Sequence, residues 1–105
     1  MDPNHAITQI QQLTSQLFSI HPSDKVRVKR IVDDIVRVLD EILSQEIPEN
    51  VAIRLGEVLD NLRKSQYYAF SDIVSRSKYG IKINDLIQKV RFNKLNSRLR
   101  KYGNR

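Results

Sequence analysis

The sequence predicts an all-α protein, and three observations support that fold class. Only three glycines and three prolines occur in 105 residues, so breaks in helices are few. No stretch alternates apolar and polar residues for long enough to form a half-buried strand. Apolar residues instead recur every three or four positions, which places them on one face of a helix. We expect three or four helices, one of them long, that dimerise into an antiparallel helical bundle.

Two short helices are predicted in the N-terminal part of the chain. The first spans about residues 5–18, with Asn4 as its N-cap. Its apolar face consists of Ile7, Ile10, Leu13 and Leu17. Pro22 ends this helix because the residue before a proline is pushed out of the helical region, and Ser23 is expected to cap the second helix. The apolar face of the second helix consists of Val28, Ile31, Ile35, Val38 or Leu39, and Ile42.

A single long helix is predicted from Pro48 to Gly80. Pro48 suits the first turn, where its missing N–H costs nothing, and Gly80 suits a left-handed cap. About thirty residues would form a rod of roughly 45 Å, which two short helices of the same chain cannot cover. We therefore expect its apolar seam to pair with a second copy of the chain. The seam consists of Val51, Leu55, Val58, Leu62, Ala69 and Ile73.

The C-terminal quarter of the chain is strongly basic. Residues 81–105 contain eight bases and one acid, whereas residues 1–80 contain ten bases and eleven acids. A fourth helix is predicted from about Ile83 to Tyr102, with a thinning apolar pattern beyond Phe92. Such segregated charge indicates a polyanion such as nucleic acid as partner, with a solubilising tail as the alternative. The bases expected to add attraction are Lys89, Arg91, Lys94, Arg98, Arg100 and Lys101.

Catalysis is not expected from this sequence. The chain has no cysteine, which excludes disulfides and thiolate metal sites. His5 and His21 lack a second histidine at i+4, and no carboxylate pair has metal-ligand spacing. Because glycine-rich phosphate loops and nucleophile motifs are also lacking, we expect no enzyme activity, cofactor or metal site. Neither a signal peptide nor a membrane span is expected, since the apolar runs are too short.

A stripe of basic and hydroxyl side chains is predicted on the outer face of the long helix. Lys64, Ser71 and Lys78 are seven residues apart, and heptad-spaced residues share a helix face. Ser75 lies beside them. Lysines suit phosphates, and hydroxyls can bond phosphate oxygens or the 2′-OH groups in the shallow groove of an A-form duplex. The stripe therefore indicates contact with an RNA backbone, and the alternative is a solvated helix face.

The order of these features resembles the nodavirus RNA-interference suppressors. Members of that family are small helical proteins that dimerise as a four-helix bundle and lie along one face of double-stranded RNA. The similarity covers about residues 33–88 and is strongest over 48–51 (Pro-Glu-Asn-Val) and 59–64 (Leu-Asp-Asn-Leu-Arg-Lys). In that family a long helix carries basic residues at heptad spacing onto the RNA backbone.

Carried onto this sequence, Lys64 matches the first of those basic residues. Ser71 stands where the family has its central arginine, and the third basic position falls on Lys78 or Tyr79. Loss of the central charge weakens phosphate binding unless Arg76 or the basic end compensates. The RNA-contacting residues indicated by the stripe, its flanking bases and the resemblance are Lys64, Ser71, Ser75, Lys78, Arg63, Arg76 and Arg54.

The resemblance implies a function in suppressing RNA silencing. The protein would bind double-stranded RNA without regard to sequence, and would shield it from Dicer-type cleavage and from loading into silencing complexes. It would act in the cytoplasm of an infected host cell. Its partners would be duplex RNA, a second copy of itself and proteins of the silencing pathway, with no small-molecule substrate. Residues 1–80 would form the dimerisation and RNA-binding core, and residues 81–105 a basic helix or tail.

Two other functions fit the same sequence. One is a helix-turn-helix DNA-binding protein of phage or plasmid origin, with its turn around Tyr79 and Gly80. A recognition helix would then begin near Ile83, and Asn84, Gln88 and Arg91 would read base edges. The other is a helical adaptor that binds a protein through its apolar seams and uses its charge for solubility.

Overall fold

The computed structural model of the chain describes residues 2–103, with side chains described as far as Leu99, and this part is helical with no strand. The all-α prediction is confirmed. The chain forms more helices than predicted. The five helices are α1 (Pro3–Ser19), α2 (Lys25–Leu43), α3 (Glu49–Ser65), α4 (Tyr67–Arg76) and α5 (Gly80–Gly103).

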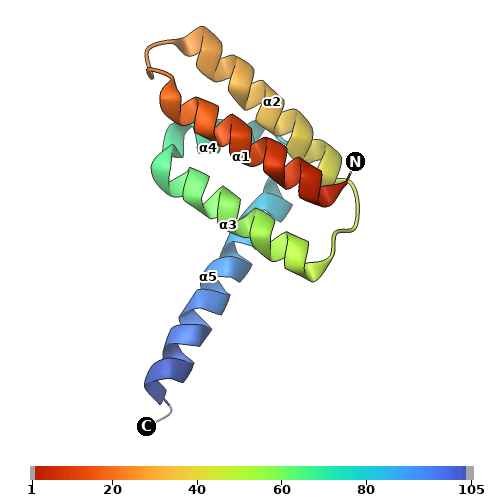
Figure 1. The fold of residues 1–105 in the computed structure, drawn as a ribbon, viewed down its shortest axis with the longest axis vertical. Helices are drawn as coiled ribbons and strands as arrows, with labels where there is room; N and C mark the ends of the chain where they lie inside the picture. Colours follow the sequence, from red (N-terminus) through yellow and green to blue (C-terminus); the bar gives the residue numbers. More distant parts are fainter. Residues whose placement is uncertain (1, 104–105) are drawn as a thin grey trace.

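The first four helices form a bundle, and α5 extends from it as an arm (Figure 1). Within the bundle α1 packs against α2 and α3, and α4 packs against α2 and α3. The first part of α5 packs against α3 and α4, while its second part continues away from the bundle. The molecule is therefore elongated, with extents of 53 × 30 × 21 Å.

Aspartates cap the first two helices, where the sequence predicted other residues. Asp2 accepts a hydrogen bond from the backbone N–H of Asn4, at 3.0 Å, so Asn4 lies inside α1 instead of capping it. Asp24 accepts from the backbone N–H of Arg27, at 3.3 Å, in place of Ser23. Both corrections move the cap by one or two residues because an aspartate was available beside the predicted cap.

The predicted long helix is wrong, because the chain turns at Gln66. This residue has φ −136° and ψ 62°, outside the helical region, and it separates α3 from α4. Two helical hydrogen bonds persist at the turn: the N–H of Gln66 donates to the carbonyl of Leu62 at 2.8 Å, and the N–H of Phe70 donates to the carbonyl of Gln66 at 2.9 Å. The turn lets α4 bury Phe70 and Ile73 and pack against α2. Packing between distant helices thus overrides a continuous helical pattern.

The turn at Gln66 removes the argument for a homodimer that rested on a long rod. Four seam residues are buried inside the single chain, and the other two, Val58 and Ala69, pack against the same core. The four buried residues are Val51, Leu55, Leu62 and Ile73. No part of that seam is left for a second copy to cover.

Gly80 begins α5 instead of capping the preceding helix. It does not adopt a left-handed conformation, so its predicted role as a C-cap is wrong. Helix α4 ends at Arg76, and Ser77 is extended, with ψ 145°. A Cβ atom at Gly80 would lie 2.9 Å from the carbonyl oxygen of Val74, so the small residue allows the two helices to approach closely.

Helices α3 and α5 cross at Gly56. A Cβ atom there would lie 2.6 Å from Cγ2 of Val90 and 2.7 Å from the carbonyl oxygen of Leu86. On the buried side of α5, Ile83, Ile87 and Val90 complete the core, and beyond Val90 no further residue of α5 through Leu99 is buried. The crossing therefore fixes the point at which α5 leaves the bundle, and the helix continues past Phe92, where the apolar pattern of the sequence thins.

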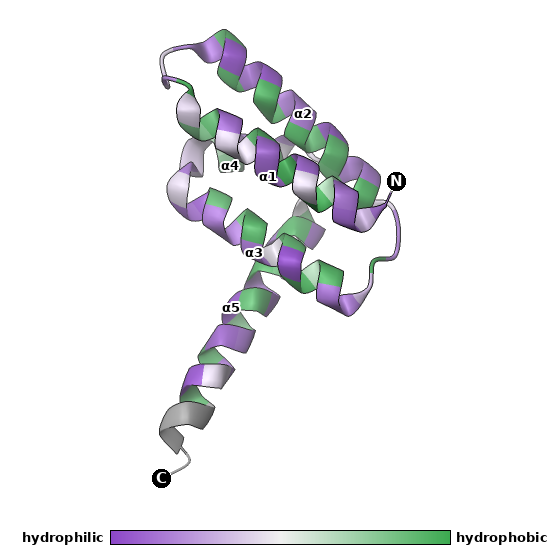
Figure 2. Cartoon of the chain, in the orientation of Figure 1, coloured by the Kyte–Doolittle hydropathy of each residue, from purple (hydrophilic) through white to green (hydrophobic). Residues whose placement is uncertain are grey.

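Figure 2 shows apolar and polar segments alternating along α1, α2 and α3, as expected for helices that bury one face. Among residues 2–103, none of the helices is both long enough and apolar enough to cross a membrane.

Candidate nucleic-acid interface

The predicted stripe does not lie on one helix. Lys64 is in the last turn of α3, Ser71 and Ser75 are on α4, and Lys78 is in the turn between α4 and α5. Because the chain bends at Gln66 and again after Arg76, heptad spacing no longer places these residues on a common face.

An aspartate of α2 holds the turn that contains Lys78. The hydroxyl of Ser77 donates to Oδ1 of Asp40 at 2.6 Å, and the backbone N–H of Lys78 donates to the same oxygen at 3.1 Å. The backbone N–H of Tyr79 in turn donates to the Ser77 hydroxyl, at 3.0 Å. Sequence reasoning missed this contact, since it joins residues almost forty positions apart. The Lys78 side chain remains exposed at the turn.

A buried carboxylate positions two of the predicted basic residues. Asp60 is fully buried on α3. Arg63 donates to its Oδ1 through Nη2 at 2.9 Å and through Nε at 3.2 Å, and the ammonium of Lys64 lies 3.2 Å from its Oδ2. Burial raises the pKa of Asp60, but the hydrogen bond from Arg63 and the neighbouring Lys64 lower it further, so the pKa falls below its ordinary value. Asp60 is therefore ionised at neutral pH and holds both cations at the end of α3.

A basic groove of about 460 Å³ lies between the C-terminal end of α3 and the distal half of α5. The two helices cross at Gly56 and lead away from each other beyond it (Figure 1). Asp60 is its one acidic residue and is already paired. Helix α5 contributes three cations to the groove, Arg91, Lys94 and Arg98. Among the described side chains, none of these three has an acidic partner within ion-pair distance. The cations that line the groove are Lys64, Arg91, Lys94 and Arg98.

A second groove, of about 380 Å³, adjoins the first at the end of α3. Arg63 lines it together with the two predicted serines of α4 and with Asn84 of α5. The hydroxyl of Ser75 donates to the carbonyl of Asp72 at 3.0 Å, which leaves its lone pairs free to accept. Ser71 is exposed on the same helix. The second groove therefore supplies neutral hydrogen-bonding groups beside the cations of the first.

The two grooves form one surface, which we call the α3–α5 basic surface. Arg63 faces one groove and its neighbour Lys64 faces the other. Its polar members are five cations and four hydroxyl or amide side chains: Arg63, Lys64, Ser71, Ser75, Asn84, Gln88, Arg91, Lys94 and Arg98. Apolar and aromatic side chains also line the two grooves, namely Phe92 and Leu95 in the first and Tyr67, Phe70 and Val74 in the second.

Three predicted basic residues have partners elsewhere. Arg54 donates to the side-chain oxygen of Asn4 at 2.6 Å. Arg76 forms an ion pair with Asp33 of α2, and Lys89 forms one with Glu49. They line neither groove of the α3–α5 basic surface. The side chains of Arg100 and Lys101, also predicted as auxiliary bases, lie outside the described residues.

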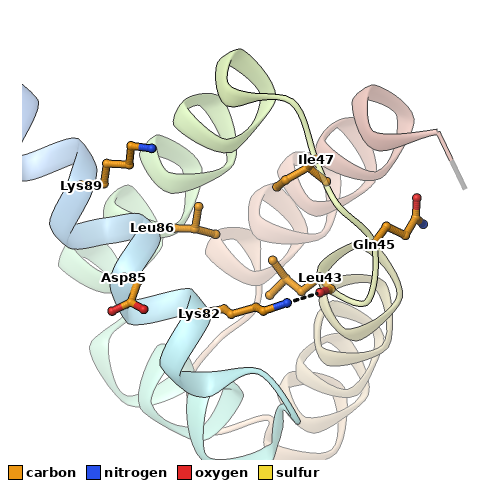
Figure 3. A pocket seen from close by; sticks show the side chains of 7 residues that line it. All are labelled: Leu43, Gln45, Ile47, Lys82, Asp85, Leu86 and Lys89. Atoms are coloured by element: carbon orange, nitrogen blue, oxygen red, sulfur yellow. Dashed lines mark hydrogen bonds between the residues drawn. The ribbon is translucent and has the colours of Figure 1, made fainter.

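A smaller pocket of about 280 Å³ lies where α5 meets the connection between α2 and α3 (Figure 3). Leu43, Ile47 and Leu86 line it, and Lys82 extends across it to donate to the carbonyl of Leu43 at 3.1 Å. Its second lysine, Lys89, is paired with Glu49. Because both ammonium groups are occupied, this pocket offers less attraction for an anion than the α3–α5 basic surface.

Comparisons with protein-family models, with curated proteins and with solved structures found no match to this chain.

Proposed function

We propose that the protein binds double-stranded RNA through its phosphate backbone, on the α3–α5 basic surface. The observation that carries the proposal is the groove between α3 and α5. Four cations line it, and its one acid is buried and paired. A groove with exposed cations and no exposed carboxylate attracts a polyanion.

The cations on the distal half of α5 extend over a length of helix that corresponds to several phosphates of a duplex. Arg98 lies seven positions after Arg91, so these two residues and Lys94 between them extend over about 10 Å of helix. A duplex carries one negative charge per about 1.7 Å of its axis, so about six charges lie within that length. The three side chains therefore have several phosphates within reach in any register along the duplex, which favours binding without regard to sequence.

The second groove supports RNA over DNA. Its serine hydroxyls and the amide of Asn84 lie beside Arg63, so they can accept or donate to ribose 2′-OH groups while the cations hold phosphate. Contacts with phosphate and ribose recognise the A-form shape of a duplex and do not depend on its base sequence.

The biological role that we propose rests on the resemblance to nodavirus suppressors. Bound protein would shield duplex RNA from Dicer-type cleavage and from silencing complexes in the cytoplasm of an infected cell. A homodimer remains part of this proposal, but the second copy would have to use a surface other than the buried seam of α3.

A second candidate is sequence-specific DNA binding, which the connection between α4 and α5 favours. Three residues, Ser77 to Tyr79, join these helices, a spacing typical of helix-turn-helix motifs. Helix α5 begins at Gly80, slightly earlier than the predicted recognition helix. Asn84, Gln88 and Arg91 are exposed, and their spacing places them on one face of α5.

A competition gel shift separates these functions. The protein is titrated against duplex RNA, duplex DNA and single strands of unrelated sequences at two salt concentrations. Preference for duplex RNA of any sequence supports our proposal, whereas binding confined to one DNA sequence supports the helix-turn-helix. Absence of any shift would contradict both and favour a protein-binding adaptor.

Two variants with equal charge loss locate the interface. R91Q/K94Q/R98Q removes three cations of the groove, and K25Q/K29Q/R30Q removes three exposed cations at the start of α2. The groove variant should flatten the dependence of log K on log salt by about 0.9 per lost contact. Equal loss in both variants would show that net charge alone drives binding, and would contradict the proposed surface.

A further inference from the structure

Helix α5 changes its apolar face where it leaves the bundle. Its proximal apolar residues Ile83, Ile87 and Val90 are buried, whereas Phe92, Leu95 and Leu99 are 60%, 53% and 59% exposed. At 3.6 residues per turn, the two sets point in directions about 150° apart. The exposed residues are spaced by three and four, so they form one stripe, which we call the distal apolar stripe.

The distal apolar stripe is not a continuation of the core contact. Continuing the buried face of α5 beyond Val90 leads to Lys94 and Ser97, which are polar and exposed. A helix that merely outran its bundle would keep its apolar residues on the same face. The distal half of α5 stands clear of the bundle in Figure 1, and Figure 2 shows apolar segments along it between polar ones. The stripe therefore faces something outside the chain.

The basic charge around the distal apolar stripe indicates which kind of partner covers it. From Leu86 to the C-terminus the sequence has seven bases and no acid. A second copy of the arm would oppose bases with bases. A nucleic acid accounts for the bases, but its phosphates make no favourable contact with leucine. An anionic lipid surface satisfies both kinds of residue, since negative headgroups lie directly above apolar chains.

We propose that the distal half of α5 binds the surface of an anionic lipid bilayer, with the distal apolar stripe inserted at the level of the headgroups. Arg91 and Arg98 border the stripe on one side, so their stems lie along the apolar boundary while their guanidinium groups reach phosphate. Residues 91–99 cover only about 13 Å of helix, so the attachment is peripheral and reversible. Arg91 and Arg98 also line the α3–α5 basic surface, so a lipid surface and duplex RNA would compete for these two residues.

Flotation with lipid vesicles tests the proposal on the full chain. Vesicles of phosphatidylcholine are compared with vesicles that also contain phosphatidylserine. L95Q/L99Q removes two half-exposed leucines of the stripe, and I81Q is the matched control, because Ile81 is 80% exposed at the bundle end of the same helix. None of these residues is in the core, so circular dichroism should be unchanged for both variants.

The wild-type protein should float with the phosphatidylserine vesicles and only weakly with phosphatidylcholine alone. L95Q/L99Q should lower the partition coefficient by at least about tenfold, while I81Q leaves it unchanged. Leu95 lines the basic groove, but L95Q/L99Q retains every cation, so the salt dependence of duplex RNA binding should be unchanged and the two proposals can fail separately.

Three results would overturn the lipid proposal. The first is that the wild-type protein does not bind the phosphatidylserine vesicles. The second is that the leucine variant binds them as tightly as wild type, which would reduce the attraction to charge alone. The third is that the leucine variant lowers self-association in sedimentation without changing vesicle binding, which would assign the stripe to a second copy.

Discussion

Leucines and arginines have different environments in the bundle and in the distal half of α5. In the bundle, leucines such as Leu55 and Leu59 are buried, and arginines such as Arg63 and Arg76 are paired with aspartates. In the distal half of α5, Leu95, Leu99, Arg91 and their neighbours are exposed. Residues that have their partners inside the chain stabilise the fold, and residues that lack them are available for an external partner. The location of a base or a leucine, more than its identity, decides its role.

The two regions should differ most in how much a leucine substitution lowers the free energy of unfolding. Leu59→Ala removes a fully buried side chain of α3 and should lower the free energy of unfolding by about 2–5 kcal/mol. Leu95→Ala, on the arm, should change it by less than about 0.5 kcal/mol. Urea denaturation followed by circular dichroism measures both. Comparable losses would show that the arm packs on the bundle in solution.

The helix crossing should tolerate no added side chain. Gly56→Ala places a methyl group within 2.7 Å of the Leu86 carbonyl, so α5 must shift away from α3. We expect a loss of about 1–3 kcal/mol in the free energy of unfolding, typical of overpacking. Ala52, which is also buried on α3, is the reference position. Ala52→Gly introduces no such clash and should lower the free energy of unfolding by only about 1 kcal/mol. A neutral or stabilising Gly56→Ala would contradict the close crossing.

Asp60 should make stability depend on pH in the acid range. Its pKa in the folded protein is below its ordinary value of 3.8, so the folded state favours the ionised carboxylate. The resulting stabilisation is present above that ordinary value and is lost as pH falls through the lower, folded-state pKa. Asp60→Asn should lower stability at neutral pH by about 1–2 kcal/mol.

The matched measurement compares urea midpoints of wild type and Asp60→Asn at neutral pH and in acid. The gap between them should narrow as pH falls below 3.8, because the wild-type carboxylate becomes protonated. A gap that stays constant with pH would mean that Asp60 contributes through shape alone.

The sequence was sufficient to predict the helical class and the N-terminal helices, because the 3.6-residue periodicity and Pro22 are local signals. The break at Gln66 was not predictable from local rules. No glycine or proline marks it, and its cause is the packing of Phe70 and Ile73 in the core of the bundle. The Asp40 contact that holds the second turn is equally long-range.

The candidate interface was predicted in part. Lys64, Ser71 and Ser75 were expected on one helix, and they line two adjoining grooves instead. Arg54 and Arg76 were included for their charge, but partners distant in the sequence occupy them. Asp60 precedes Arg63 and Lys64 by three and four residues, so the pairing was visible in the sequence. The burial of Asp60 was not visible in the sequence, because it depends on how α5 crosses α3.

Truncation after Phe92 tests most directly whether the bundle carries the fold and the arm carries the attraction for RNA. It removes Lys94, Arg98, Arg100, Lys101 and Arg105. Among the side chains described as far as Leu99, it removes none that is buried, since the core contacts of α5 end at Val90. The truncated protein should keep the unfolding midpoint of the full chain. It should bind duplex RNA more weakly, with a flatter salt dependence, and still prefer RNA over DNA. Unchanged affinity, or loss of the fold, would contradict this division between bundle and arm.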